Sequence, residues 1–305
     1  MERWLWTQKQ DIGPSPRSGH TMTYDSEKQK VLLFGGRAVG ELNDTWEWDG
    51  NVWGQVADTG PSARTFSAMA FDPLRKKAVL FGGLNGQNGQ NLNDTWEWDG
   101  NEWTQVGDTG PSSRRAHAMV YDSIEKTVVL FGGYSQIQGN DIFYGDTWEW
   151  DGTDWTLIAE TGPPGRTYHS MAYNESEQNV VLYSGAASGQ PIPGDTWLLQ
   201  DKKWKKAQDI GPGSLSQSSM VYTSHGVVLF GGSYTDNNQT SDNTWVWDGK
   251  YWTQRQDIGP SHRRLHSMAY DAQRERVVLF GGATSPPGVK YYGDTWELRI
   301  ETGPE

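Results

Sequence analysis

Short apolar runs alternate with charged or glycine-containing turns along the whole chain. The first four runs are separated by turn-forming segments such as DSEKQK and the pair Asp49-Gly50. Short apolar runs bounded by turn formers are typical of β-strands, and Asp-Gly is a strong signal for a two-residue hairpin turn, in which both positions tolerate positive φ. The pattern therefore predicts four antiparallel strands, A to D, over residues 19–24, 31–34, 45–48 and 52–56.

The same four-strand unit recurs six times. An apolar run ends in a glycine pair about every 50 residues, which indicates an internal repeat. Short antiparallel units repeated in this way predict an all-β, six-bladed β-propeller of four-stranded antiparallel blades, because radial closure leaves only short sheet edges. The pairs are Gly35-Gly36, Gly82-Gly83, Gly132-Gly133, Gly231-Gly232 and Gly281-Gly282, and Ser184-Gly185 takes this place in the fourth unit.

The two ends of the chain supply parts of one blade. The last unit stops after strand C at Trp296 and has no strand D, whereas WTQKQDIGP at 6–14 matches WTQRQDIGP at 252–260. We expect the N-terminal strand to be the outermost strand of the last blade and so to close the ring. On this basis, residues 1–305 form a single β-propeller domain.

These features resemble the kelch family. In all six units the glycine pair is accompanied by a Trp that opens strand C and a Trp in strand D, Trp46 and Trp53 in the first unit. The resemblance covers essentially the whole chain and implies a kelch β-propeller. It implies much less about function, because one fold hosts many unrelated activities.

Composition and charge exclude several classes of function. The chain has 26 Lys and Arg against 38 Asp and Glu, a formal net charge of -12, and lacks the basic runs that nucleic-acid binding requires. It has no Cys, which excludes disulfides, Cys-ligated metals and a kelch-type copper radical oxidase with its Tyr–Cys crosslink. No 18-residue apolar window and no signal-peptide core are present, so we expect a cytoplasmic monomer with no membrane partner.

The 17 tryptophans could indicate a stacking surface for sugars or bases. All but Trp4 occupy repeated positions, at the start of strand C, two residues later, or in strand D. Large aromatic side chains at repeated strand positions usually belong to the core. We therefore predict that the tryptophans are framework residues and do not mark a ligand site.

An Arg precedes strand A in five units, and an Asp precedes strand C in the same five. The fifth unit has Leu215 and Asn243 in their places. Losing one partner of a buried ion pair costs about 3 to 5 kcal/mol, whereas replacing both can be nearly neutral. The joint loss favours a structural bridge, and a cationic or proton-transferring ring near the pore is the alternative. The residues are Arg17, Arg64, Arg114, Arg166 and Arg263, then Asp44, Asp94, Asp146, Asp195 and Asp294, with His20, His117, His169 and His266 nearby.

The loop of the fifth unit is rich in side-chain oxygens. Asp236, Asn238, Thr240 and Asp242 alternate as the ligands of a calcium loop do, but the Gly and the Glu of such a loop are absent. We expect a solvated loop at this place. No metal and no other cofactor is predicted for the chain.

The candidate site lies on one face of the disc. The B to C and D to A connections share that face, and the B to C loops differ most between units, as binding loops on a rigid scaffold do. The loops of units three and six are aromatic and stand opposite each other across the pore, where they could form two walls of a cleft. The predicted ligand-binding residues are Arg37, Arg115, Tyr134, Phe143, Tyr144, Tyr234, His262, Arg264, Lys290, Tyr291 and Tyr292.

Three classes of function remain open. The favoured one is a binding propeller that presents this face to a peptide, a protein or a small ligand, similar to kelch substrate adaptors, whose arginine-lined pockets take acidic peptides. The alternative is a metal-independent enzyme, an isomerase, lyase or cyclase, with its site at the mouth of the pore. A deep enclosed pocket with a desolvated acid or base would distinguish the enzyme. A lectin, a third possibility, would require exposed tryptophans.

Overall fold

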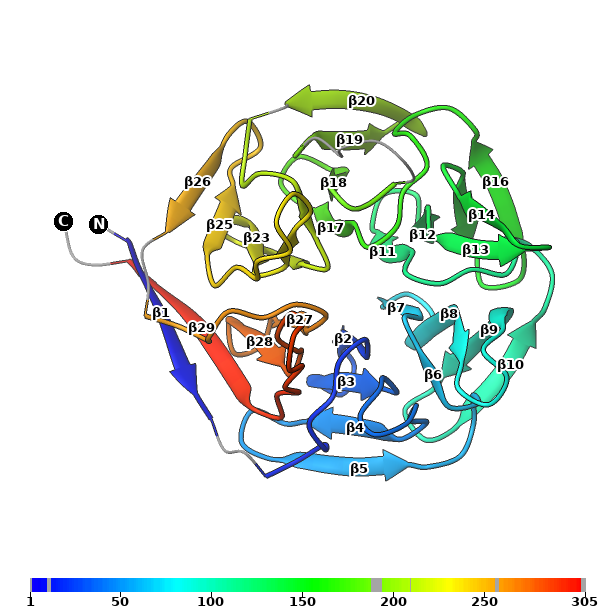
Figure 1. The fold of residues 1–305 in the computed structure, drawn as a ribbon, viewed down its shortest axis with the longest axis horizontal. Helices are drawn as coiled ribbons and strands as arrows, with labels where there is room; N and C mark the ends of the chain where they lie inside the picture. Colours follow the sequence, from blue (N-terminus) through cyan, green and yellow to red (C-terminus); the bar gives the residue numbers. More distant parts are fainter. Residues whose placement is uncertain (1, 10–11, 188–193, 209, 256–257, 303–305) are drawn as a thin grey trace.

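Six antiparallel sheets, each with four main strands, surround a central opening in the computed structural model, which describes residues 2–9, 12–187, 194–208, 210–255 and 258–302 (Figure 1). The described residues form strands and no helix. None of them therefore belongs to a helix long and apolar enough to cross a membrane. The arrangement confirms the predicted six-bladed propeller with four antiparallel strands in each blade.

From the centre outward, the four main strands of each blade follow in the order A to D, and each strand pairs antiparallel with its neighbours. Three blades carry additional short strands on their loops: β6 (Arg64–Thr65), β13 (Tyr134–Ile137), β14 (Asn140–Phe143), β21 (Leu215–Ser216) and β24 (Ser233–Tyr234). Blade one has β2 (Thr21–Asp25), β3 (Lys30–Phe34), β4 (Thr45–Trp48) and β5 (Trp53–Ala57); blade two has β7 (Ala68–Asp72), β8 (Lys77–Asn85), β9 (Asn91–Trp98) and β10 (Trp103–Gly107); blade three has β11 (Ala118–Asp122), β12 (Thr127–Phe131), β15 (Thr147–Trp150) and β16 (Trp155–Ala159). Blade four has β17 (Ser170–Asn174), β18 (Asn179–Tyr183), β19 (Thr196–Gln200) and β20 (Lys203–Gln208); blade five has β22 (Ser219–Thr223), β23 (Gly226–Phe230), β25 (Thr244–Trp247) and β26 (Trp252–Arg255); blade six has β27 (Ser267–Asp271), β28 (Arg276–Phe280), β29 (Thr295–Thr302) and β1 (Glu2–Gln8).

The N-terminal strand closes the ring, as predicted. Strand β1 pairs antiparallel with β29, with Trp6 opposite Leu298, and the first and last strands of the chain lie side by side (Figure 1). Trp6 also reaches the neighbouring blade, because its Nε1 donates a hydrogen bond to Thr244 Oγ1 at 3.1 Å. The first and last strands thus hold blades five and six together.

The apolar core lies between the blades. Strand β3 is buried on both faces from Val31 to Phe34, because Val31 and Leu33 pack on blade six while Leu32 and Phe34 pack on blade two. Buried apolar surface contributes about 25 cal/mol per Å². Each blade is therefore stabilised mainly by its two neighbours.

All 17 tryptophans fall within the described ranges and none of them is exposed, which confirms their framework role. Trp4, outside the repeat scheme, packs in the same core and contacts His225 edge-on. The Trp in strand D also links blades, because its Nε1 donates to the Thr hydroxyl that opens strand C of the preceding blade, at 2.8 to 3.1 Å. The pairs are Trp6–Thr244, Trp53–Thr295, Trp103–Thr45, Trp155–Thr95, Trp204–Thr147 and Trp252–Thr196.

In five of the six blades, a buried bidentate bridge joins two connections on one face. In blade two, Arg64 Nη1 and Nη2 donate to the two carboxylate oxygens of Asp94 at 2.7 and 2.8 Å, and Nη1 also donates to the Gly82 carbonyl. Burial raises the pKa of Asp94, but the hydrogen bonds and charge of Arg64 outweigh burial and hold this pKa below its usual value. The prediction of structural pairing is confirmed, because the same bridge joins Arg17 to Asp44, Arg114 to Asp146, Arg166 to Asp195 and Arg263 to Asp294.

Blade five keeps its architecture without this bridge. Leu215 is buried in an apolar cluster with Trp247, and Asn243 accepts a hydrogen bond from Gln254 at 3.0 Å. The Trp that follows the first Thr of strand C donates to the bridging Asp at 2.7 Å in the other blades, whereas Trp245 Nε1 has no partner among the described residues. Both partners of the ion pair are thus replaced together, the Arg by an apolar contact and the Asp by a neutral hydrogen bond.

Four histidines are structural. The ring of His20 is buried and meets the Phe280 ring of the neighbouring blade edge-on, with centroids 5.5 Å apart. Burial, reinforced by the charge of Arg17, lowers the pKa of His20 to about 3. These imidazoles are therefore neutral at neutral pH. The same contact is made by His117 on Phe81, His169 on Phe131 and His266 on Phe230.

The hairpin turn between strands C and D differs from the predicted one. The central residues of the turn between β4 and β5 are Gly50 and Asn51, and of these only Gly50 has positive φ, at 96°. Asp49 precedes them, and its Oδ1 accepts the N–H groups of Asn51 and Val52 at 2.8 and 2.9 Å. The assignment of Asp and Gly to the two central positions was wrong, because the Asp side chain caps the turn from the preceding position.

Two connections predicted as loops are hairpins. In blade two, β8 and β9 continue as a pair past Gly82-Gly83. In blade three, β13 and β14 form a separate two-stranded sheet with positive φ at both Gln138 and Gly139. The repeat pattern did not reveal these strands, because each belongs to one blade alone.

The bridge can be tested by reproducing blade five in blade two. We expect Arg64→Leu to lower the free energy of unfolding by about 3 to 5 kcal/mol, because the Asp94 carboxylate loses a partner in a mostly buried place. The double variant Arg64→Leu/Asp94→Asn, which copies Leu215 and Asn243, should be more stable than the single one. Urea denaturation measures both, and a double variant less stable than the single one would contradict the bridge.

The buried histidines predict destabilisation below about pH 6.5. The folded pKa of His20 lies near 3 and the unfolded pKa is about 6.5, so the unfolded state binds the proton first as pH falls, and each such imidazole lowers stability by about 2 kcal/mol at pH 5. His20→Ser, the residue present at this place in blades two and five, should reduce the stability difference between pH 7.5 and pH 5 by that amount. Ser67→Ala, at the same place in blade two, changes no titratable group and is the control, which should leave the difference unchanged in urea titrations.

Candidate functional site

A closed ring of backbone hydrogen bonds surrounds the mouth of the central opening. In each blade, the residue two positions after the bridging Arg, or after Leu215 in blade five, donates its N–H to the carbonyl of its counterpart in the preceding blade, at 2.8 to 2.9 Å. All of these residues have φ between 52° and 64°, in the left-handed region. The ring members are Gly19, Phe66, Ala116, Tyr168, Gln217 and Leu265.

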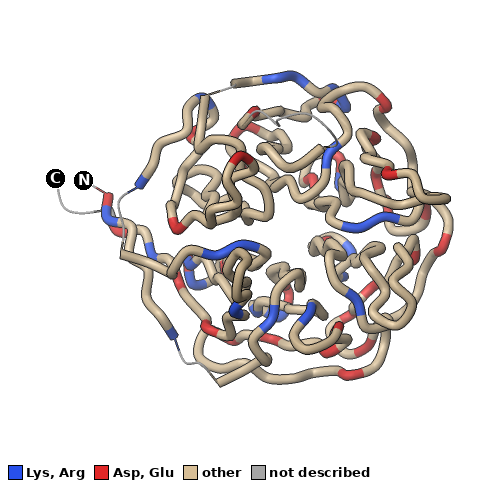
Figure 2. Tube along the Cα trace, in the orientation of Figure 1, with Lys and Arg blue, Asp and Glu red and all other residues tan. Residues whose placement is uncertain are grey.

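The residue before each ring member has a fixed backbone partner in its own blade. It pairs with the residue that follows the glycine pair of its blade, as in the bridges of Arg115 with Tyr134 and of Arg264 with Ala283. Figure 2 shows Lys and Arg on the loops around the central opening. The bridge and the ring together therefore set which side chains line the mouth on the face made by the B to C and D to A connections, called here the loop face.

A hollow of about 430 Å³ lies on the loop face, lined by residues of blades three to six. It brings together four of the predicted ligand-binding residues, which are Arg115, Tyr134, Phe143 and Arg264. Its other polar lining is neutral and comes mainly from blades four and five: Thr167, Ser216, Gln217, Ser233, Thr235 and Asn238.

Arg115 and Arg264 differ from the bridging arginines, because neither forms an ion pair within the part of the chain that the structure describes. The guanidinium carbon of Arg115 lies 4.8 Å from the centre of the Tyr134 ring. Arg264 Nη1 donates to Gln217 Oε1 at 3.0 Å, and its buried Nε has no hydrogen-bond partner among the described residues. Burial lowers the pKa of Arg264. The hollow therefore holds two positive charges without a carboxylate.

Tyr168 lies within electrostatic reach of both arginines. Burial raises the pKa of its hydroxyl, and the charges of Arg115 and Arg264 oppose that rise. Its ring meets Phe66 of blade two edge-on, with centroids 5.4 Å apart and an interplanar angle of 89°. Two members of the backbone ring thus place an aromatic pair at the centre of the mouth.

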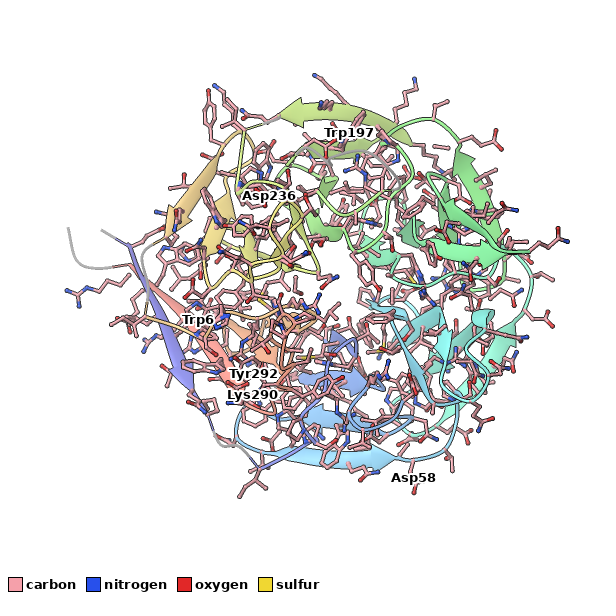
Figure 3. All side chains as sticks on the ribbon, in the orientation of Figure 1. Trp6, Asp58, Trp197, Asp236, Lys290 and Tyr292 are labelled. Carbon is pink, nitrogen blue, oxygen red and sulfur yellow. The ribbon has the colours of Figure 1, made fainter. Side chains whose placement is uncertain are left out.

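The aromatic residues of loop six lie elsewhere. Lys290, Tyr291 and Tyr292 line a second hollow of about 640 Å³ together with Pro14 and other residues at the entry to blade one. Figure 3 shows Tyr292 and Lys290 next to each other over blade six, and Lys290 Nζ is 5.3 Å from the centre of the Tyr292 ring. Loops three and six therefore line two separate hollows and do not form the walls of one cleft.

Two of the predicted tyrosines stack on bridging arginines. The guanidinium carbon of Arg114 lies 3.9 Å from the centre of the Tyr144 ring, and that of Arg263 lies 4.2 Å from the centre of the Tyr292 ring. The guanidinium of a bridging Arg is already buried and is bound to Asp along its edge. Its planar face can therefore contact an aromatic ring at little further cost in solvation free energy. These contacts give Tyr144 and Tyr292 a structural role that their position in a loop does not reveal.

Three other predicted residues are held by local contacts outside the hollow that Arg115 and Arg264 line. Arg37 forms an ion pair with Glu41 at 3.8 Å. Tyr234 pairs with Leu215 through β24 and β21 and packs against the core of blade five. His262 Nδ1 shares a hydrogen bond of 2.6 Å with Thr240 Oγ1.

The loop of blade five folds as a tight turn. Asn238 has φ of 57°, and its N–H donates to the Tyr234 carbonyl at 2.9 Å. Asn238 lines the hollow, whereas Asp236 lies on the loop above blade five (Figure 3). Within the described ranges, no group of three or more His, Asp or Glu side chains is placed to hold a metal ion.

Two overlapping stretches of the chain, residues 1–156 and 74–219, match the family described as the KLHDC2/KLHL20/DRC7 Kelch-repeats domain. The chain belongs to the kelch-repeat family. A solved structure called "Structure of YjhT" is similar to this kelch propeller with a TM-score of 0.75 and 14% sequence identity, over 95% of this chain and 98% of that one. This likeness shows the shared fold alone. No curated protein matches the chain.

Sequence reasoning missed the central residues of this kelch propeller's hollow. Tyr168 and Gln217 were not among the predicted ligand-binding residues, although both line the hollow and Gln217 anchors Arg264. A signal was present, because the position two after the bridging Arg is occupied by a different residue in every blade. Such variation within an otherwise regular repeat marks a position that the shared framework does not constrain.

The two tyrosines of loop three should respond differently to truncation. We expect Tyr144→Ala to lower the free energy of unfolding by about 2 kcal/mol or more, because it uncovers the buried Arg114 guanidinium. Tyr134→Ala should change stability by less than about 1 kcal/mol, because its half-buried ring lines the hollow and covers no bridging arginine. Urea denaturation of the two kelch variants measures the difference, and equal losses would contradict the structural role of Tyr144.

Proposed function

We propose that this kelch propeller is a binding module whose loop face takes a peptide, a protein or a small ligand in the hollow between blades three and six. The observation that carries the proposal is the pair Arg115 and Arg264, neither of which forms an ion pair with a residue that the structure describes. In the same molecule, all five bridging arginines are matched by an Asp. An unmatched charge in a partly closed place favours a bound anion.

The repeat supports this interpretation. The position after the bridging Arg is Ser or Thr in blades one, two, four and five, and Arg only in blades three and six. A small hydroxyl residue therefore satisfies the fold at this position. A buried or half-buried guanidinium costs solvation free energy unless it is paired, so the two arginines add nothing that the framework needs.

Family membership points in the same direction. Kelch β-propellers typically mediate protein interactions, and the kelch adaptors that this chain resembles hold acidic peptides in arginine-lined pockets. The hollow of this propeller, with aromatic, cationic and neutral polar residues, has the mixed lining of a ligand site. Tyr and Arg are also the residues most often found at the energetic centre of binding surfaces.

The enzymatic alternative finds less support. No His, Asp or Glu occurs among the described residues that line the hollow, so the usual groups for proton transfer are absent from that lining. The buried histidines lie against phenylalanine rings. A lectin surface would need exposed tryptophans, and none of the 17 is exposed.

The proposal is tested by what the protein retains when it is purified from its own host. We expect a ligand or partner, detected by native mass spectrometry and by pull-down, to be recovered with the parent chain and lost with Arg115→Thr/Arg264→Ser, which installs the residues of the other blades. Arg37→Ala is the matched control, because Ala186 and Ala283 occupy that position in blades four and six. Equal recovery with the double variant and with the control would refute the site, provided that the melting temperatures agree.

A further inference from the structure

Arg115 and Arg264, which have no ion-pair partner in the described ranges, come from opposite sides of the ring. In a six-bladed propeller, blades three and six face each other across the central opening (Figure 1). Arg115 and Arg264 occupy the same place in the repeat, next to the backbone ring, yet both line one hollow. A ligand in this hollow is therefore approached by a guanidinium from each of two opposite directions.

Both guanidiniums are anchored by neutral groups and keep free donors. Arg115 rests on the face of the Tyr134 ring, which uses none of its N–H groups. Arg264 donates to Gln217 through Nη1 alone, and its Nη2 makes no hydrogen bond with the described residues. An arginine has five N–H donors in a fork that matches a carboxylate or a phosphate. Each guanidinium can thus bind an anionic group without giving up its anchor.

The space between the arginines is aromatic. The Tyr168 ring lies within reach of both charges and is held edge-on by Phe66, and the rings of Tyr134 and Phe143 are in edge-on contact with each other at 5.3 Å. The rest of the lining is neutral, including Thr235 and Asn238. A single anionic group would neutralise one arginine and leave the other charge in place.

We propose that the hollow takes a small dianion, a molecule in which a planar apolar spacer separates two anionic groups, with one group on Arg115, the other on Arg264 and the spacer over Tyr168. This inference rests on the proposed function, because it names the ligand of the same hollow. A volume of about 430 Å³ falls in the range of sites for small molecules. Carboxylates and phosphates share the required chemistry.

Four probes test the charge and the spacer. Isophthalate and terephthalate are planar dianions that differ in the spacing of their carboxylates, benzoate is the matched monoanion, and an end-capped Glu-Gly-Glu peptide carries two carboxylates on a flexible chain. We expect at least one phthalate isomer to bind the parent protein at least about 10-fold more tightly than benzoate in isothermal titration calorimetry. We expect the peptide to bind more weakly than that isomer, because ordering its chain costs entropy.

Single variants assign one anionic group to each arginine. Arg115→Thr and Arg264→Ser should each reduce the affinity for the preferred dianion about 10-fold or more and bring it close to that of benzoate. Arg37→Ala, which lies on the same face but outside the hollow, should leave the affinity unchanged. The titrations are made at fixed low salt, because screening weakens ion pairs.

Three outcomes would overturn the dianion. These are equal binding of benzoate and both phthalates, tighter binding of the peptide than of either phthalate, and no binding of any probe. A loss of affinity in only one of the two single variants would also contradict the two-point arrangement. None of these results removes the proposed function, which fails only if co-purification is insensitive to both arginines.

Discussion

The bidentate bridge between the arginine before strand A and the aspartate before strand C fixes the geometry of the loop face. A guanidinium can be buried there only because a carboxylate and a backbone carbonyl satisfy its donors together. The bridge ties the linker from the preceding blade to the loop between β3 and β4, or their counterparts. The next two residues, one facing the hollow and one in the backbone ring, take their positions from it. In blade five, Leu215 holds the same place by apolar packing.

The fold could be predicted from sequence because the chain solves one packing problem six times, and agreement between units removes the ambiguity of any single strand. The bridge could be predicted for a related reason, because the joint change to Leu215 and Asn243 shows that the Arg and Asp positions depend on each other. The loops differ from unit to unit, so agreement between units cannot help to predict them. Whether Tyr144 faces solvent or covers Arg114, and whether Tyr291 shares a hollow with Tyr134, depend on the curvature of the ring and on loop paths that no repeat specifies.

Departures from the repeat carry most of the functional information in this kelch protein. The seven arginines next to the mouth fall into two groups that sequence alone does not separate. Five are neutralised within their own blades, and Arg115 and Arg264 are not. The aromatic residues differ in the same way, because Tyr292 stacks on the bridging Arg263 whereas Tyr168 lines the hollow. Charge that the framework leaves unbalanced is a more selective guide to a site than the presence of a charged or aromatic residue.

The circular set of backbone hydrogen bonds has a consequence for how such a mouth can change. Backbone hydrogen bonds hold the ring together. The side chains at the six ring positions are therefore largely not needed to maintain it. Glycine is required only at residue 19, where a Cβ would lie 2.8 Å from the ring of Phe66. Elsewhere Phe, Ala, Tyr, Gln and Leu are all accommodated in the left-handed conformation. The side chain at each ring position can therefore change, and with it the ligand preference of the mouth, one blade at a time and without loss of the backbone ring.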